Sequence, residues 1–427
     1  MPTYRSRVLE QELQTLSAQL PAIAIDGAKG VGKTETATRY AMTVVRLDDP
    51  AQLAVAQADP TRLLHASKPI LLDEWQRLPA VWDAVRRAVD RDNSANQFLL
   101  TGSAFPADAD LHSGAGRIVR LRMRPLSLAE RGRETPSVSL GTLLSGTQPT
   151  LDGASATTLS DYVAEILSGG FPGLRQLGDR ALRAQLDGYI ENIVDRDFAE
   201  AGHRVRRPHT LLRWMRAHAA ATSTTASFET IRDAATGGQQ QKPAKTATAL
   251  YRDVLERIWI LDQVPPWLPS HNQLGVLAQS PKHHLADPAL AARLLNLDAD
   301  ALLRGESGDA PQQLVPRDGA MLGQLFESLV VQSVRVYGQA SEASVHHLRT
   351  QGGAHEVDLI VARGDRRVLA IEVKLSAAIT DDDVKQLHWL RNRIGDDLLD
   401  AIVITTGPQA YRRTDGIGVV PAALLGP

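Results

Sequence analysis

Short apolar runs recur through the first third of the chain, and each of them ends in polar residues. They span Ala22–Asp26, Thr43–Leu47, Lys68–Glu74, Gln97–Ser103 and Gly116–Arg124. Segments with helical spacing lie between them, such as Val81–Asp90, and residues 1–20 place their apolar side chains on one face of a helix. Strands that alternate with helices predict a parallel α/β sheet over this part of the chain.

The centre of the chain is helical by the spacing of its apolar residues. The predicted helices cover Asp161–Leu167, Ala181–Ala199, Thr210–Ala220, Ser227–Ala235 and Lys245–Leu261. A stretch rich in Ser, Thr, Gly and Pro, Glu134–Ser160, precedes them, and we expect it to be a loop-containing insertion or linker. The run Ile258–Trp267 then turns extended, so the last three helices and this wing favour a winged-helix module.

Several arginines lie at the start of that module. They are Arg204, Arg206, Arg207, Arg213 and Arg216. Arginines at this place can contact nucleic-acid phosphates. They can equally form a solvated face or a protein contact, because only eight of the 47 basic residues are lysine.

Composition limits the classes of protein to consider. A chain of 427 residues is long for one core, so we expect roughly two to four domains. The net charge of −2 means that any nucleic-acid binding comes from local patches. The absence of cysteine excludes disulfides, zinc–thiolate sites and thiol catalysis. The N-terminus shows no apolar signal core, and no apolar run approaches ~18 residues, so we expect a cytoplasmic enzyme with no membrane partner.

The stretch after the first apolar run carries a phosphate-binding motif. Gly27-Ala28-Lys29-Gly30-Val31-Gly32-Lys33-Thr34 matches G-x-x-x-x-G-K-T in full, and Glu35 follows in a helix-compatible segment. The glycines let successive main-chain N–H groups surround an anion, and the helix start adds a partial positive charge. We expect Lys33 to reach the β- and γ-phosphates of ATP and Thr34 to ligate Mg²⁺.

Two further apolar runs end in residues that suit ATP hydrolysis. Asp73 and Glu74 end one of them, where a P-loop ATPase needs an acid for the Mg²⁺ shell and a neighbouring acid to polarise water. Two adjacent carboxylates beside an apolar strand are costly without a cation nearby. Thr101, at the end of the next run, is a candidate for sensing the γ-phosphate. No N-K-x-D stretch occurs, so a guanine-specific GTPase is not expected.

These motifs together resemble the bacterial and archaeal ATPases of the extended AAA class that carry an uncharacterised C-terminal nuclease-like domain. The supporting stretches are GAKGVGKT, PILLDEWQRLP, FLLTGSA, GRIVRLRMRPLSLAERG and SGGFPGL. The resemblance implies a helical lid and a winged-helix module after the ATPase core. It also makes Arg117 the candidate arginine for the γ-phosphate, with a structural salt bridge as the alternative. Lys29-Gly30 and Glu35 depart from the usual pattern of that family.

The last third of the chain carries a second set of candidate residues. Leu322, Leu325, Phe326, Leu329 and Val330 predict a helix that bears Glu327, a hairpin follows over His355–Lys374, and another strand begins at Ile402. Asp358 on one hairpin strand, with Glu372 and Lys374 on the other, resembles the PD-(D/E)xK nuclease superfamily.

The turn length of this hairpin fixes which residues face each other. With a three-residue turn at Gly364–Arg366, Asp358 falls directly opposite Glu372, and Lys374 points the same way. Facing carboxylates repel unless a cation lies between them. We therefore expect Mg²⁺ on Asp358, Glu372 and Glu327, with Lys374 beside the attacking water. The alternative is an exposed hairpin with ordinary charge pairs.

The predicted fold class is α/β, with a P-loop parallel-sheet domain (1–128), a helical lid and linker (129–202), a winged-helix-like domain (203–275) and a restriction-endonuclease-like α/β domain (276–427). Two function classes follow. The first is an ATPase that acts on nucleic acid, DNA in particular, and controls a metal-dependent nuclease. The second is an ATP-loaded switch that binds nucleic acid or a protein without cleaving. A homo-oligomer is compatible with both.

Overall fold

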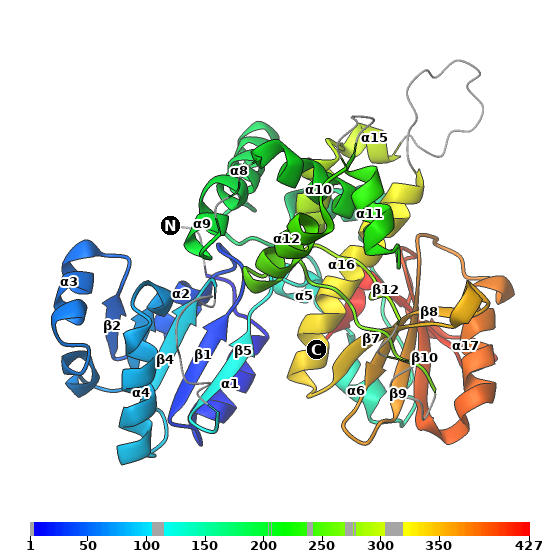
Figure 1. Ribbon diagram of the computed structural model, residues 1–427. Helices are drawn as coiled ribbons and strands as arrows, with labels where there is room; N and C mark the ends of the chain where they lie inside the picture. The colour runs from blue at the N-terminus through cyan, green and yellow to red at the C-terminus, as the bar shows by residue number, and fades with distance from the viewer. Residues whose placement is uncertain are drawn as a thin grey trace.

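The computed structural model describes residues 4–104, 115–203, 205, 207–236, 242–269, 276, 279–303 and 319–427. The chain forms three parts, and Figure 1 shows two sheet-containing parts side by side, joined across the top by a group of helices. The colour order places the N-terminal sheet at one side and the C-terminal sheet at the other. The long helix α16 (Gly319–Ala340) runs between them.

The N-terminal part is a parallel sheet of the kind that the alternating pattern predicts. Its described strands have the order β2-β3-β4-β1-β5 and pair in parallel throughout. They are β1 (Ala22–Asp26), β2 (Thr43–Arg46), β3 (Ile70–Asp73), β4 (Phe98–Gly102) and β5 (Ile118–Arg122). β1, β3 and β4 are buried along their whole length, as expected of strands that are covered on both faces.

Helices cover both faces of this sheet. They are α1 (Leu9–Ser17), α2 (Lys33–Thr38), α3 (Pro50–Ala58) and α4 (Ala80–Arg91). Trp82 of α4 packs against Trp75 with the rings tilted and 4.6 Å between ring centroids, within a core that also contains Ala22 and Ala24. The alternate β1 residues Ile23 and Ile25 belong to a second core on the opposite face. The helix predicted over residues 1–20 is shorter than expected, since α1 begins at Leu9 and ends at Ser17.

The middle part consists of helices. They are α7 (Leu159–Ser168), α8 (Asp179–Asn192), α9 (Phe198–Glu200), α10 (Pro208–Ala220), α11 (Phe228–Ala234), α12 (Lys245–Arg257), α14 (Pro288–Leu294) and α15 (Ala299–Leu303). A π-helical turn, Ile193–Asp197, joins α8 to α9. After α12 the chain is extended, and two isolated bridges pair Leu261 with Leu285 and Val264 with Lys282. We name these paired segments, 261–264 and 282–285, the central hairpin.

The C-terminal part is a mixed sheet with the strand order β11-β12-β10-β9-β8-β7. Its strands are β7 (Ser344–Arg349), β8 (Glu356–Ala362), β9 (Val368–Lys374), β10 (Leu398–Thr405), β11 (Tyr411–Arg412) and β12 (Gly418–Pro421). The predicted hairpin is β8–β9, and the strand expected from Ile402 is β10, which lies parallel to β9. Helix α17 (Asp381–Ile394) packs on one face, and α16 packs on the other.

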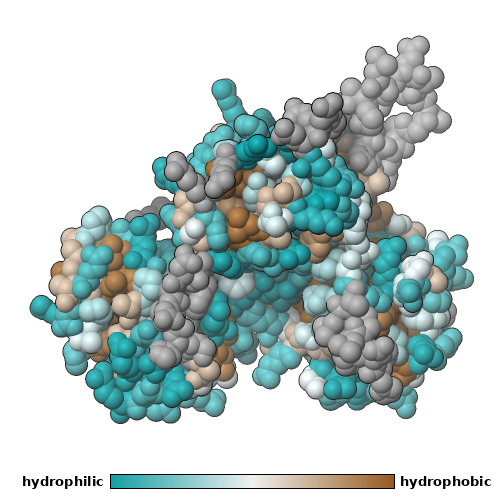
Figure 2. Space-filling view, in the orientation of Figure 1, coloured by the Kyte–Doolittle hydropathy of each residue, from teal (hydrophilic) through white to brown (hydrophobic). Residues whose placement is uncertain are grey.

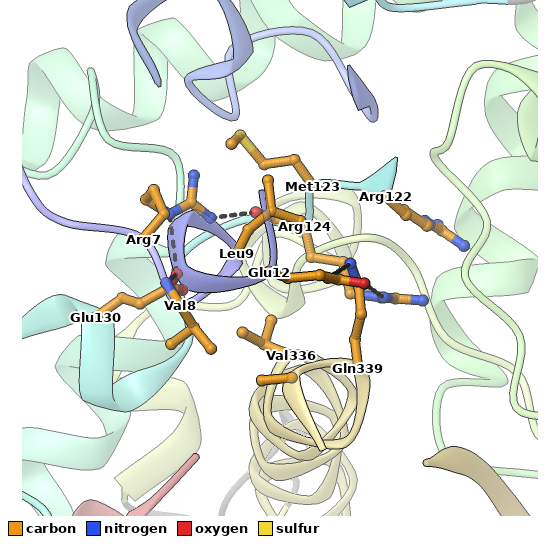
Figure 3. Close-up of a pocket in the computed structure, with 11 residues that line it drawn as sticks. Arg7, Val8, Leu9, Glu12, Arg122, Met123, Arg124, Glu130, Val336 and Gln339 are labelled. Atoms are coloured by element: carbon orange, nitrogen blue, oxygen red, sulfur yellow. Dashed lines mark hydrogen bonds and ion pairs between the residues drawn. The ribbon is translucent and has the colours of Figure 1, made fainter. Parts of the chain in front are cut away.

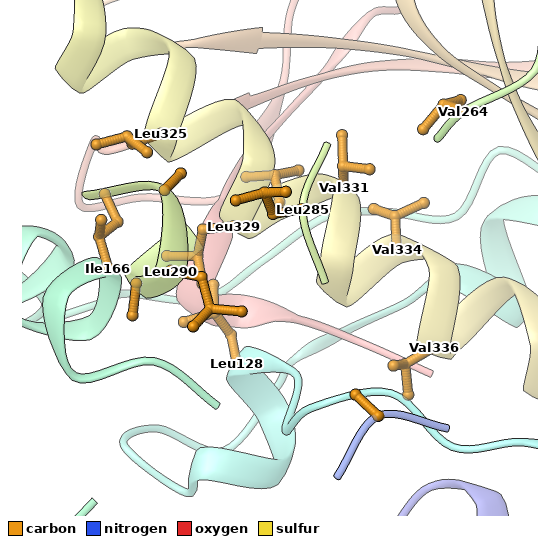
Figure 4. Close-up of a cluster of buried hydrophobic side chains, with 14 of the residues drawn as sticks. Leu128, Ile166, Val264, Leu285, Leu290, Leu325, Leu329, Val331, Val334 and Val336 are labelled. Carbon is orange, nitrogen blue, oxygen red and sulfur yellow. The ribbon is translucent and has the colours of Figure 1, made fainter. Parts of the chain in front are cut away.

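One apolar core runs through all three parts. Figure 4 shows Leu325, Leu329 and Val334 of α16 between residues of the helical middle and Leu128 of α5 (Leu128–Arg131). The same core includes Leu13 of α1. Burial of apolar side chains in this shared core stabilises the arrangement of the three parts, because each Å² of apolar area removed from water contributes about 25 cal/mol.

The polar stretch 134–160 packs against the C-terminal sheet, which agrees with the loop-containing insertion and not with the linker that the sequence left as the alternative. It forms β6 (Val138–Ser139) and α6 (Leu140–Leu144), and β6 pairs in parallel with β13 (Leu425–Gly426) at the end of the chain. α6 packs against β9, β10 and α16. Leu140, Leu143 and Leu144 are buried, so these few apolar residues anchor the polar stretch to the C-terminal sheet.

The hydropathy of the visible surface differs from place to place. Figure 2 shows mostly hydrophilic residues in the hollow below the helical middle, between the two sheet-containing parts. None of the helices described is both long enough and apolar enough to cross a membrane. Arg204 and Arg206, which the sequence offered as phosphate contacts, lie outside the described residues.

Candidate functional site

The G-x-x-x-x-G-K-T stretch forms a tight loop between β1 and α2, in the strand–turn–helix context that the motif requires. Gly27 approaches the carbonyl oxygen of Met123 so closely that a Cβ on Gly27 would lie 2.1 Å from it. Gly32 caps α2 with φ +102°, in the left-handed region that favours glycine. The loop therefore requires glycine at both of these positions, while Ala28 and Val31 point into the core.

Lys33 lies inside this loop. Its Nζ donates to the main-chain carbonyls of Gly27 at 2.8 Å and Ala28 at 2.9 Å, and the side chain is buried. Burial lowers the pKa of Lys33 to about 8, against the opposing charges of Glu74, Asp26 and Asp73. An ammonium whose partners are only carbonyl oxygens and carboxylates at a distance is well placed to accept phosphate oxygens instead.

A carboxylate and two hydroxyls meet beside the loop. Asp73 Oδ1 accepts a hydrogen bond from Thr34 Oγ1 at 2.8 Å and another from the Thr101 hydroxyl. The parallel pairing of β3 with β4 sets Asp73 directly beside Thr101. These oxygens suit Mg²⁺, which prefers carboxylate, hydroxyl and water ligands. The sequence predicted Thr34, Asp73 and Thr101 separately, and the structure brings them together.

Glu74 follows at the end of β3 in an unusual conformation. Its φ of 54° and ψ of 45° lie in the left-handed region, which non-glycine residues adopt mainly at functional or tightly constrained sites. The carboxylate accepts hydrogen bonds from the Gln76 amide and from Ser103 Oγ, the latter at 3.5 Å. Gln76 also donates to Ser103 at 3.2 Å. Gln76 orients Glu74, and no motif in the sequence indicated this residue.

Residues from outside the loop fix its outer side. The Arg7 guanidinium donates to the carbonyl of Val31 at 2.7 Å and to that of Arg124 at 2.6 Å, and it pairs with Glu130. Figure 3 shows Arg7 beside Glu130, with Gln339 of α16 reaching the same small cavity. Arg7 therefore ties the phosphate-binding loop to the end of β5, and sequence patterns alone gave no sign of this.

Lys29, at the tip of the loop, contacts the helical middle. Its Nζ lies 2.6 Å from Asp197 Oδ1 and 2.7 Å from Glu200 Oε2, and its main-chain carbonyl accepts a hydrogen bond from Tyr189 at 3.0 Å. Burial alone would lower the pKa of Lys29, but hydrogen bonds to the two carboxylates raise it. The basic residue that departs from the family pattern thus holds the helical middle against the loop.

A cavity of about 290 Å³ opens beside Gly32 and the first turn of α2. Tyr4 and Arg5 line one side, and Glu35 and Thr36 line the helix side. The third side is lined by Pro172 and Gly173 of the SGGFPGL stretch and by Arg175 and Gln176, which follow it. Tyr4 hydrogen-bonds to Thr36 at 3.0 Å. Glu35 itself forms an exposed ion pair with Arg39, at 3.0 Å.

Arg117 lies at the wrong edge of the sheet for a phosphate contact within one chain. The pairing of β1 with β5 runs from Ala22–Ile118 to Asp26–Arg122, and Arg117 precedes the first pair while the phosphate-binding loop follows the last. Four strand residues span about 13 Å. Arg117 Nε instead pairs with Asp90 at 2.8 Å. The salt-bridge alternative describes this residue, and its assignment to the chain's own γ-phosphate is corrected.

The second set of candidate residues lies where α16 crosses β8 and β9. The pairing of Leu359 with Ile371 and of Ala362 with Val368 is the predicted register. One further step of it places Asp358 across from Glu372. Asp358 Oδ2 accepts from the main-chain N–H of Val373 at 2.9 Å, and Lys374 Nζ donates to Glu372 Oε2 at 2.8 Å.

A residue that the sequence analysis did not single out completes this group. Lys282, from the central hairpin, is 1% exposed, and its Nζ lies 2.8 Å from Glu327 Oε1 and 3.0 Å from Asp358 Oδ1. Glu356 Oε1 is a further neighbour at 3.5 Å. The only signal in the sequence was that lysine is scarce, with eight in the whole chain. Nothing in the sequence showed that this lysine would be buried, which is unusual for the residue type.

Burial and the neighbouring charges shift the pKa values of the side chains in this group. Burial alone would raise the pKa of Asp358, but Lys282 and Lys374 outweigh it and lower the pKa. Burial raises the pKa of Glu327 to about 8, and burial together with the charge of Asp358 raises that of Glu372. For Lys282, burial opposes the charged form, but the carboxylates of Glu327 and Asp358 raise the pKa above its usual range.

The predicted metal set needs correction on this geometry. Over the described part of the chain, no three or more His, Cys, Asp or Glu side chains are grouped so that they could hold a metal ion. Glu327 and Asp358 both turn to the Lys282 ammonium, and Glu372 turns to Lys374. The acids lie near one another as predicted, but lysines take their oxygens.

Comparisons with known proteins divide the chain in a similar way. A family model described as an AAA domain matches residues 19–131. The N-terminal part therefore matches an AAA domain, which is a P-loop NTPase type of domain, and we call it the AAA domain below. Two domains of unknown function, DUF8612 and DUF4143, match residues 159–301 and 322–425. The first of these covers the helical middle, and the second covers α16 and the C-terminal sheet.

Relatives match almost the whole chain. The uncharacterized proteins Rv2008c of Mycobacterium tuberculosis and Mb2031c of Mycobacterium bovis are each 24% identical over 437 residues, which covers 99% of this chain and 86% of the relative. Among solved structures, the Walker-type ATPase PABY2304 of Pyrococcus abyssi is 14% identical over 66% of this chain and 93% of its own, with a TM-score of 0.38. The ORC2 protein of Aeropyrum pernix is 15% identical over 68% and 93%, with a TM-score of 0.28.

Proposed function

We propose that this protein binds ATP with Mg²⁺ at the AAA domain and hydrolyses it, and that nucleotide turnover controls what the other two parts bind. The observation that carries the proposal is the group formed by Lys33, Thr34, Asp73 and Thr101. Hydroxyl, carboxylate and ammonium meet at the carboxyl ends of adjacent parallel strands. In open α/β sheets this edge is where ligands bind.

Each residue has a distinct task in the proposed reaction. The N–H groups of Gly27–Thr34 and the Lys33 ammonium hold the phosphates, and Thr34 with Asp73 provides the oxygen ligands for Mg²⁺, which neutralises phosphate charge when bound. Glu74 accepts a proton from the attacking water, and Gln76 orients Glu74. Water oxygen bonds to the γ-phosphorus as the bond to the bridging oxygen breaks, giving ADP and phosphate.

The cavity beside Gly32 suits the nucleoside end of ATP. It adjoins the end of the phosphate-binding loop, and its volume of about 290 Å³ is near the lower limit of small-molecule sites. Residues before β1 and after α7 line it, so a bound nucleoside would contact both the AAA domain and the helical middle. Occupation of this cavity is the physical link that we propose between nucleotide state and the position of the helical middle.

The nuclease assignment and the binding-switch assignment compete for the C-terminal part. The contacts of Lys282 with Glu327 and Asp358 favour the switch, because the acids that a nuclease would use for its metal have other partners. We propose that this part binds a partner without cleaving it, nucleic acid and DNA in particular. The support is the resemblance to ATPases with nuclease-like domains and the hydrophilic hollow between the parts.

ATP hydrolysis measured with and without DNA and RNA tests the proposal. Lys33→Ala should abolish nucleotide binding, while Lys385→Ala, an exposed lysine on α17, should not. Glu74→Gln should bind ATP and hydrolyse it about 10²–10⁴-fold more slowly. Wild-type turnover in a folded Lys33→Ala protein would reject the ATPase assignment. Metal-dependent cleavage of DNA or RNA by the wild type would reject the switch and support the nuclease.

A further inference from the structure

Lys282 reaches the C-terminal acids from a different part of the molecule. It lies on the central hairpin, where its main chain exchanges two hydrogen bonds of 2.9 Å with Val264. Its side chain passes between α16 and β8, and both Glu327 and Asp358 lie within 3.0 Å of Nζ. A lysine that is 1% exposed needs anionic partners, so the contacts account for its burial.

The ammonium occupies the position that a metal ion would need. A divalent cation ligated by Glu327 and Asp358 would lie about 2.0–2.6 Å from their oxygens, between the helix acid and the strand acid. Lys282 Nζ is within hydrogen-bonding distance of the same two oxygens. An ammonium and a divalent ion cannot both occupy that space, and they would repel each other.

One carboxylate oxygen of this group has no partner among the described residues. Glu372 is 4% exposed, and its Oε1 has no hydrogen-bond partner among the residues described. A buried carboxylate oxygen without a partner is costly. It lies on the strand facing Asp358, so it is the expected third ligand of a cation that replaces Lys282.

We propose that Lys282 is a built-in cation that closes a latent divalent-metal site formed by Glu327, Asp358 and Glu372. The site accepts a metal ion only when the segment 282–285 withdraws. This inference goes beyond the proposed ATPase function and does not depend on it. It assigns a role to a residue of the helical middle, and it makes the C-terminal site conditional on where the central hairpin lies.

Binding of Mn²⁺ to the nucleotide-free, full-length protein tests the proposal, and electron paramagnetic resonance counts the bound ions. The wild type should show no binding that depends on Asp358, so wild type and Asp358→Asn should bind Mn²⁺ equally. Lys282→Met removes the ammonium and should gain one site. Lys282→Met combined with Asp358→Asn should lose that gained site. Lys245→Met, which changes a lysine with a 78% exposed side chain, is the matched control and should behave as wild type.

Thermal unfolding gives a second reading. Lys282→Met should melt at a lower temperature than wild type, because the carboxylates lose their cation, and Mn²⁺ should restore much of the loss. Mn²⁺ should not shift the melting temperature of Lys282→Met combined with Asp358→Asn in the same way. A wild type that binds Mn²⁺ through Asp358 overturns the proposal, even if Lys282→Met fails to fold. A folded Lys282→Met protein without a new site overturns it as well.

Discussion

Asp262 and Lys282 lie on the two paired segments of the central hairpin, yet their side chains serve different parts of the molecule. The main chain of Asp262 donates to the carbonyl of His284 at 3.0 Å, and Val264 pairs with Lys282. Asp262 points to the end of β5 in the AAA domain, whereas Lys282 points to the C-terminal acids. Main-chain hydrogen bonds of the hairpin therefore connect the end of β5 with the C-terminal acids.

Asp262 should be important for stability at neutral pH. Its carboxylate lies within 3.0 Å of the guanidinium groups of Arg122, Arg124 and Arg335. Asp262→Asn would remove the shared anion of one buried and two partly buried arginines, and removing one partner of a buried pair costs about 3–5 kcal/mol. Urea unfolding at pH 7 checks this. Asp365→Asn, which breaks an ion pair in the β8–β9 turn with a 42% exposed Asp365 side chain, is the control and should cost little.

The contribution of Asp262 should fall in acid. Burial alone would raise its pKa, but the three arginines outweigh burial and lower the pKa far below its usual range. A lowered folded-state pKa gives stability that is present above the unfolded pKa of about 3.9 and is lost below it, by ~1.4 kcal/mol per pH unit. The stability difference between wild type and Asp262→Asn should therefore shrink as the pH falls from 5 to 3. A constant difference would contradict the ion-pair assignment.

Arg117→Ala should reduce ATP hydrolysis by no more than about twofold. An arginine that meets the γ-phosphate contributes about 10³–10⁵ in rate, but Arg117 lies at the opposite edge of the sheet and pairs with Asp90. Steady-state ATPase rates at saturating ATP provide the measurement. A thousandfold loss in a folded protein would show that a second copy of the chain brings Arg117 to its neighbour's site.

Gln76→Ala should slow hydrolysis without weakening ATP binding. Gln76 hydrogen-bonds to Glu74 and Ser103, and these bonds orient the acid and do not bind phosphate. Its loss would let Glu74 leave the orientation that activates water, so kcat should fall while KM stays constant. If Gln76→Ala raised KM and left kcat unchanged, Gln76 would have a binding role instead. Gln76→Glu would add a second acid and should not restore the rate.

Lys29→Met should loosen the helical middle from the AAA domain. The ion pairs of Lys29 with Asp197 and Glu200 are partly exposed, so each contributes about 1 kcal/mol or less. Hydrogen exchange of the amides from Asp197 to Glu200 should become a few-fold faster, while ATP still binds through Lys33. Lys68→Met, which removes a 3.7 Å ion pair elsewhere in the sheet, is the control. Unchanged exchange at Asp197 would show that Tyr189 and the apolar core hold this contact.

Asp358→Asn should lower stability in metal-free buffer. From the sequence alone, removal of one of two facing acids is expected to leave stability unchanged or raised, because Asp358 and Glu372 repel each other. The structure reverses this expectation, since Lys282 would lose a partner at 3.0 Å inside the protein. Melting temperatures of Asp358→Asn and wild type, with EDTA present, decide between the two.

The local features of this protein followed from its sequence. The G-x-x-x-x-G-K-T loop, the strands that end at Asp73 and Thr101, and the β8–β9 register each depend on residues close together in the chain. Side-chain alternation and turn length fix such features, because a shift of one residue would turn every apolar side chain of a strand to the wrong face. The sequence alone therefore determined the phosphate-binding loop, the strand ends that carry Asp73 and Thr101, and the register that sets Asp358 against Glu372. The order of the strands in the sheet then brought Asp73 and Thr101 beside the loop.

Contacts between distant segments were decided only by the tertiary structure. Lys282 lies 45 residues from Glu327 and 76 from Asp358 along the chain, and no periodic pattern links them. The polar stretch 134–160 joined the C-terminal sheet through a few buried leucines, against its linker-like composition. Arg117 lost its phosphate role because strand direction, and not motif position, decides at which edge of a sheet a residue lies. Packing of the three parts on α16 selects these contacts, and local spacing carries no information about them.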